Sequence, residues 1–221
     1  MCNLHPLSPI LIIFAVLFGM GEVAYSQLTY IPDQESRLWI EGRSNVNEFE
    51  CHANQYFAEA TLIDDNDPVE FQQQIEQRVF MQVDIRVDGF ECGRSRMNQD
   101  LQKALKSSEF PEISFIFDSA TILSIPGNPS DNNAFEIDVR GSLTVAGNTR
   151  NIQFTSKAYF VETYRIRAIG KTTIRMTDFG VEPPTALMGL IKAEDELTVN
   201  FDLYANESEA ICQICPSLLQ Q

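Results

Sequence analysis

The feature that most constrains this chain is the regular alternation of apolar and polar residues between Phe135 and Phe154. In an extended strand, successive side chains point to opposite faces, so this pattern predicts a strand with one dry and one wet side. Ala146-Gly147-Asn148 then interrupts the strand. Gly and Asn tolerate positive φ, and the alternation of apolar and polar residues resumes at Ile152. The pattern therefore predicts a β-hairpin. The apolar face of such a strand has to be covered, either by other side chains or by a ligand.

The same period of two recurs along much of the chain. Further strands are predicted at residues 29–40, 49–62, 79–87, 113–118, 164–176 and 197–205. A polar bend is expected at 42–47, and loops at 64–68 and 126–133. Arg96–Lys106 has helical spacing instead, with Met97, Leu101, Ala104 and Leu105 on one stripe. About eight antiparallel strands avoid exposed edges by closing into a barrel or packing as a sandwich.

The first 26 residues have the features of a signal peptide. An apolar run at Ile10–Met20 is followed by Ala24-Tyr25-Ser26, a small-x-small cleavage pattern. The apolar run is too short to span a bilayer, which takes about 20 residues. We therefore expect cleavage after Ser26 and a periplasmic or secreted protein. The domain organisation is then a signal peptide at 1–26, a β-barrel domain at 27–205 and a polar tail at 206–221.

The charge balance limits the partners. Loss of Glu22 with the signal peptide changes the net charge from −15 to −14. Nucleic acids and anionic lipid surfaces require basic patches, so neither is an expected partner. No later segment is long and apolar enough for stable membrane insertion. The composition is compatible with a homodimer.

Four cysteines follow the signal peptide: Cys51, Cys92, Cys212 and Cys215. An even number in an exported chain predicts disulfides. We favour the pair Cys51–Cys92, which would be worth roughly 4 kcal/mol through closure of a long loop. The Cys212-Gln-Ile-Cys215 motif lies in the polar tail, outside any βαβ unit. A structural disulfide or free thiols are therefore favoured there over a redox-active pair, and the spacing argues against a zinc site.

The motifs of catalysis are missing from the sequence. His52 is the one histidine after the signal peptide, and no Gly-x-Ser-x-Gly motif accompanies it. No phosphate-binding glycine loop is present, and Asp178-Phe179-Gly180 stands without the other kinase motifs. We predict a protein that is not an enzyme and has no metal or cofactor.

Four segments together resemble the YceI-like family of exported bacterial proteins, across about residues 29–205. They are SRLWIEGRSNVNEFEC at 36–51, MNQDLQKALKSSEFPEISF at 97–115, GSLTVAG at 141–147 and TDFGVEPPTALMGLIK at 177–192. The resemblance implies an all-β fold: an eight-stranded antiparallel, lipocalin-like barrel with one short helix. The chain resembles a divergent branch of that family. The commoner members have a His directly after the Asp that opens the helix, whereas here Asp100 is followed by Leu101.

Studied members of that family hold polyisoprenoids or other long amphiphiles inside the barrel. The resemblance therefore implies non-catalytic binding and carriage of a long-chain lipid, polyisoprenoid or quinone-like. The residues predicted to line the apolar cavity are Phe115, Phe117, Leu143, Val145, Ile174 and Met176, with Leu187, Met188 and Leu190 near a mouth. One alternative is an interaction or stress-response module with a fully packed core. Another is a thiol-exchange protein that uses Cys212 and Cys215.

Overall fold

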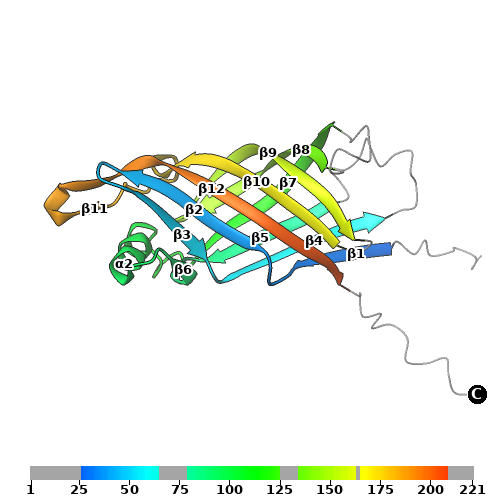
Figure 1. Cartoon of the computed structure of the whole chain (residues 1–221), viewed down its shortest axis with the longest axis horizontal. Coiled ribbons are helices and arrows are strands. Elements are labelled where there is room, and N and C mark those ends of the chain that lie inside the picture. The colour runs from blue at the N-terminus through cyan, green and yellow to red at the C-terminus, as the bar shows by residue number, and fades with distance from the viewer. Residues whose placement is uncertain (1–25, 65–78, 125–133, 163–164, 209–221) are drawn as a thin grey trace, which may run out of the picture.

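The computed structural model describes residues 26–64, 79–124, 134–162 and 165–208, and it shows a closed antiparallel barrel with one helix (Figure 1). This confirms the predicted fold class. Eight strands follow one another around the barrel: β1 (Ser26–Pro32), β4 (Tyr56–Asp64), β5 (Val79–Arg86), β7 (Glu112–Ser124), β8 (Ala134–Val145), β9 (Asn148–Glu162), β10 (Arg165–Arg175) and β12 (Ile191–Ser208). The ring closes because β1 pairs with β12, from Thr29 opposite Ser208 to Pro32 opposite Ala205.

Two strands that the sequence predicts as continuous are each broken in two. Residues 29–40 form β1 and then β2 (Arg37–Ser44), and residues 49–62 form β3 (Glu48–Ala53) and then β4. The first break arises at Ser36, whose hydroxyl both donates to the carbonyl oxygen of Tyr204 and accepts from its N–H, each at 2.9 Å. These side-chain bonds replace backbone pairing, so one strand becomes two that both pair with β12.

The second break lies at Asn54–Gln55, between β3 and β4. The predicted bend at 42–47 is shorter than expected, because β2 runs on to Ser44. The Ser44 side chain accepts hydrogen bonds from the N–H groups of Val46 and Asn47 and closes the turn to β3. The predicted loop at 126–133 lies outside the described residues, as does nearly all of the predicted turn at 64–68.

The predicted hairpin is confirmed, but its two turn residues are Ala146 and Gly147, and Asn148 lies outside the turn. Ala146 and Gly147 adopt φ of 47° and 76°, which is the pattern of a two-residue type I′ turn between β8 and β9. Asn148 was expected to tolerate positive φ, but it begins β9. Its side-chain amide donates to the carbonyl oxygens of Ala146 at 3.1 Å and Phe179 at 2.9 Å. It therefore ties the hairpin to the 3-10 helix η4 (Met176–Phe179).

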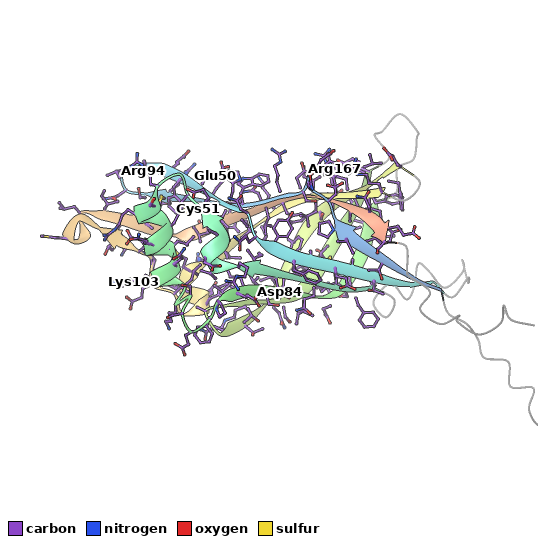
Figure 2. The ribbon with its side chains drawn as sticks, turned by 90° about the horizontal axis from the view of Figure 1, so that it is seen from below. Glu50, Cys51, Asp84, Arg94, Lys103 and Arg167 are labelled. Carbon is purple, nitrogen blue, oxygen red and sulfur yellow. A yellow bond between two sulfur atoms is a disulfide. The ribbon has the colours of Figure 1, made fainter. Side chains whose placement is uncertain are left out.

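Helix α2 (Ser95–Ala104) covers one end of the barrel, where β3 has no long partner on its outer edge (Figure 1). Here β3 pairs with only the two residues of β6 (Phe90–Glu91), which follow the 3-10 helix η3 (Val87–Gly89). The predicted Cys51–Cys92 disulfide is present and joins β3 to the segment that leads into α2 (Figure 2). Cys212 and Cys215 lie outside the described residues.

The buried core lies in the half of the barrel next to α2. Leu101 of the helix and Phe115 of β7 pack against both of its clusters. Its fully or nearly fully buried members include Val87, Leu105, Leu143, Val145 and Phe179 in one cluster and Leu38, Cys51, Val83, Ile85 and Phe90 in the other. The core therefore fills only part of the barrel's length.

A partly buried ion pair lies on the outer wall. The side chain of Asp202 on β12 is 5% exposed, and Arg167 of β10 grips both its oxygens at 2.7 and 2.8 Å. Arg167 points outward from the barrel in Figure 2, and its guanidinium lies 5.0 Å from the ring centroid of Tyr204. These hydrogen bonds lower the pKa of Asp202 below its ordinary value of 3.8. The ion pair links β10 to its neighbour β12, the longest strand of the barrel.

We predict that replacing both Cys51 and Cys92 by Ser destabilises the barrel. The disulfide joins residues 41 positions apart. Its loss raises the conformational entropy of the unfolded chain, which lowers the free energy of unfolding by roughly 4 kcal/mol. Urea unfolding of oxidised wild type and of the double variant measures this difference. Equal midpoints would contradict the structural role of the disulfide.

We predict that Asp202→Asn lowers the unfolding free energy at neutral pH by about 1–3 kcal/mol, because it leaves the Arg167 guanidinium without its charged partner. A depressed pKa contributes stability above the unfolded-state pKa, and this contribution disappears as the pH falls through the folded-state value. Wild type should therefore lose stability more steeply than the variant as the pH falls below about 4. Thermal melts as a function of pH test this, and parallel curves for the two proteins would refute it.

Candidate functional site

The inward faces of the strands enclose a cavity of about 880 Å³. This space comes from the same alternation that builds the strands, because every second residue points to the barrel interior. A single water molecule needs only about 10–15 Å³ of such space, and it also needs two to four polar partners. The cavity is far larger than one water, and its walls are almost entirely apolar. Such a cavity favours an apolar occupant over water.

The inward-facing residues are less buried in the half of the barrel away from α2. Inward-facing apolar residues there are only half-buried, although their side chains line the cavity: Val79, Met81, Phe117, Ala120, Ile122, Phe135, Ile137, Ile166, Ala168 and Leu203. Their counterparts near the helix, such as Val83, Ile85 and Leu143, are buried. One barrel therefore contains a packed half and an unfilled half.

Inward-facing glycines let aromatic rings lie against the wall. A Cβ on Gly141 would come within 2.5 Å of the Phe115 ring, and one on Gly170 within 2.5 Å of the Phe201 ring. Phe154 lies between these two rings, with centroid distances of 5.9 Å to Phe115 and 5.6 Å to Phe201. The three phenylalanines form an aromatic layer across the interior. The register of β7 against β8 shifts between Phe117 and Ser119, opposite Gly141 and Arg140.

Polar groups of the lining gather at its rim. At the α2 end the cavity reaches Arg94, Arg96 and Asp100 of the helix segment, and Ser44 and Asn47 of the β2–β3 turn. Arg96 and Asp100 form an ion pair at 3.1 Å. Figure 2 shows Arg94 at the start and Lys103 near the end of the helix, which lies across this end of the barrel.

Two further polar groups of the wall are neutral. Ser156 is 3% exposed, and its hydroxyl donates to the carbonyl oxygen of Ile169 at 3.1 Å. Tyr30 also lines the cavity, and its pKa is raised above 10.0 by burial and then by the charge of Glu207. Its phenol is therefore uncharged at neutral pH. The interior offers apolar contact with few hydrogen-bonding groups, which suits a hydrocarbon chain.

Six predicted site residues line this cavity: Phe115, Phe117, Leu143, Val145, Ile174 and Met176. Leu143, Val145 and Met176 belong to the packed half, whereas Phe117 faces the unfilled half. Met188 and Leu190 were expected near a mouth, but they are 107% and 74% exposed and are not among the lining residues. Their hairpin turns through positive φ at Met188 and Gly189, which carries it away from the barrel. The Leu187 side chain lies outside the described residues.

Sequence reasoning missed other lining residues. Among them are Phe49, Met81, Phe135, Phe154, Ile166 and Phe201. The signal was the same alternation on the neighbouring strands, but alternation alone does not say which inward residues meet a void. In the part of the chain that the structure describes, no group of three or more His, Cys, Asp or Glu could hold a metal ion. Within the same residues, no helix is both long and apolar enough to cross a bilayer.

The YceI-like domain model matches residues 32–205, which is most of the chain. The chain belongs to the YceI-like family. Among curated proteins, no sequence matches it.

Solved YceI-like and related barrels share the fold. BcnA of Burkholderia cenocepacia superposes with a TM-score of 0.59 at 19% identity, over 79% of this chain and 99% of BcnA. A polyisoprenoid-binding domain from Saccharophagus degradans, implicated in plant cell wall breakdown, gives 0.59 at 10% identity, over 83% and 100%. The YceI protein of Campylobacter jejuni gives 0.53 at 19% identity, over 72% and 85%. At these identities the likeness supports a common fold.

We predict that Gly141→Ala destabilises the protein by about 1–3 kcal/mol, as overpacking does in a filled core. The added methyl group would meet the Phe115 ring and also the Ile116 carbonyl oxygen, both at 2.5 Å. The neighbouring outward-facing Ser142→Ala serves as the control in urea unfolding. Similar midpoints for the two variants would show that the Phe115 ring does not need this space.

Proposed function

We propose that this YceI-like protein binds one long-chain amphiphile, such as a polyisoprenoid, inside its barrel and carries it without chemical change. The observation that supports this most strongly is the unfilled, apolar half of the barrel, which is continuous with the rest of the 880 Å³ cavity. The polyisoprenoid-binding domain from Saccharophagus degradans has the same fold and supports the same class of ligand.

The energetics of burial are sufficient for such a ligand. Each buried methylene contributes about 0.8 kcal/mol, so one five-carbon isoprene unit contributes roughly 3–4 kcal/mol gross. Association costs about 4–15 kcal/mol, and micromolar affinity needs a net of about 8 kcal/mol. The gross requirement is therefore about 12–23 kcal/mol, which roughly three to eight units supply on apolar contact alone. The rim at Arg94, Arg96 and Asp100 is available to a polar head group.

The cavity argues against the alternative of a packed-core module without a ligand. That alternative requires inward side chains that fill the barrel, whereas Phe117, Ala120 and Ile166 face unfilled space. Thiol exchange at Cys212 and Cys215 concerns residues outside those described, and it stays a separate prediction. We place the carrier in the periplasm or outside the cell, because the predicted signal peptide supports export.

The proposal is tested by filling the unfilled half of the barrel. Ala168 on β10 lines it and is half-buried, so Ala168→Trp adds bulk where there is room. We expect at least tenfold weaker binding of a dansyl-labelled long-chain amphiphile, with little change in thermal stability. Thr173→Trp on the outer face of the same strand is the matched control. Leu143→Trp is unsuitable for this test, because Leu143 is 8% exposed in the packed core and the added bulk would lower stability as well as binding.

An organic extract of the purified exported protein, analysed by mass spectrometry, identifies the natural ligand. An extract without any amphiphile, together with no uptake of the labelled chain by wild type, would refute the proposed function. Equal binding by wild type and Ala168→Trp would place the ligand elsewhere than in the barrel.

A further inference from the structure

Two neighbouring hairpins at the α2 end expose large apolar side chains. The β2–β3 turn carries Val46, which is 61% exposed, and the hairpin from β11 (Thr185–Ala186) to β12 carries Met188 and Leu190, at 107% and 74%. Figure 1 shows β11 and its hairpin projecting beyond the barrel at this end. We call Val46, Met188 and Leu190 the apolar tip. Packing within the described chain gives no reason for these three side chains to be apolar.

Asn45 joins the two hairpins into one structure. Its side-chain amide donates to the carbonyl oxygen of Leu190 at 2.8 Å, and its side-chain oxygen accepts from the N–H of Lys192 at 3.0 Å. Its own N–H donates to the carbonyl oxygen of Lys192 at 3.1 Å. Three hydrogen bonds from one residue thus hold Val46 beside the Met188–Leu190 segment. The apolar tip is a built feature of the fold.

The backbone at the tip is also unusual. Met188 has φ 58° and ψ 32°, a left-handed conformation that a side chain with a Cβ disfavours. Gly, Asn or Asp would make this turn more easily. The geometry of the turn therefore does not account for a methionine that is fully exposed at its apex. Residues held in such conformations cluster at sites of contact and function.

The base of the tip forms part of the cavity wall. Ser44 and Asn47 flank Val46 and line the cavity, and so do Thr185 and Ile191 on either side of the projecting hairpin. The cavity therefore reaches the residues at which both hairpins leave the barrel. Whatever the apolar tip contacts will lie next to the cavity.

A lipid bilayer fits the apolar tip better than a protein does. A stable protein interface buries about 800 Å² on each partner, which three side chains on a narrow projection cannot supply. The interface of a bilayer accepts a few apolar side chains at shallow depth. The chain carries a net charge of −15, so electrically neutral lipids suit it better than anionic ones.

We propose that the apolar tip docks the barrel on a neutral lipid bilayer and holds the foot of the cavity against it. The contact orients the barrel, with its packed half and α2 toward the bilayer and its unfilled half away from it. The docking contact is peripheral, made by the hairpin side chains alone. The identity of any carried molecule rests on the proposed function, whereas the membrane contact rests on the tip itself.

The test is co-sedimentation of the full exported protein with phosphatidylcholine vesicles. Replacing both Met188 and Leu190 by Gln removes the apolar surface without adding charge, and we expect at least tenfold weaker vesicle binding. The matched control replaces Ile116 and Leu123 by Gln, since these lie on the outer face of β7 and are 52% and 55% exposed. Vesicle binding by the control should equal that of wild type, and added salt should not abolish it.

Wild type that stays in the supernatant, or a Met188→Gln/Leu190→Gln protein that sediments as wild type does, would overturn the docking proposal. Extraction of the same preparations separates the two proposals. An amphiphile in the extract without vesicle binding would refute docking and leave the proposed function intact. Vesicle binding through the tip, with an empty extract and no uptake of the labelled chain, would support docking and refute carriage.

Discussion

Closure of the sheet between β1 and β12 is the constraint on which the rest of this structure depends. An antiparallel sheet of eight strands with one apolar face has two unpaired edges and a large dry surface. Joining the edges satisfies the backbone hydrogen bonds and turns the dry face into an interior. Once the ring is closed, the number and tilt of the strands set the width of the barrel, and the inward side chains decide how much of it is filled. The cavity is the part that those side chains leave unfilled.

The chain uses its side chains unevenly within this fixed volume. Near α2 the apolar face of the helix, the Cys51–Cys92 disulfide and residues such as Val87 and Phe179 complete a buried core. Away from α2 the inward residues are also apolar, but they line the cavity and are only half-buried. The packed half supplies stability and the unfilled half supplies the candidate binding space. On the outside, Arg167 and Asp202 hold β10 to β12 in the unfilled half, where the core contributes less.

Much of the fold and part of the site could be read from the sequence. The period of two located the strands, the helical stripe located α2, and the even cysteine count suggested the disulfide. Prediction failed where long-range contacts overrode local pattern. The break at Ser36 depends on Tyr204, and the turn at Ala146–Gly147 leaves Asn148 free to bind the Phe179 carbonyl. Met188 and Leu190 read as lining because they are apolar, yet the left-handed turn beside them points them outward.

The sequence by itself determined that the strands have one apolar face and that one amphipathic helix accompanies them, because both follow from local patterns. The barrel fold was implied by the resemblance of four segments to the YceI-like family. Only the tertiary structure decided which dry residues touch one another and which face a void. That distinction depends on distances across the barrel between residues far apart in the chain, such as Phe115, Phe154 and Phe201. It also decided that two hairpins meet through Asn45 to form the apolar tip. Residue type determines whether a side chain leaves water, but the three-dimensional arrangement determines what it meets.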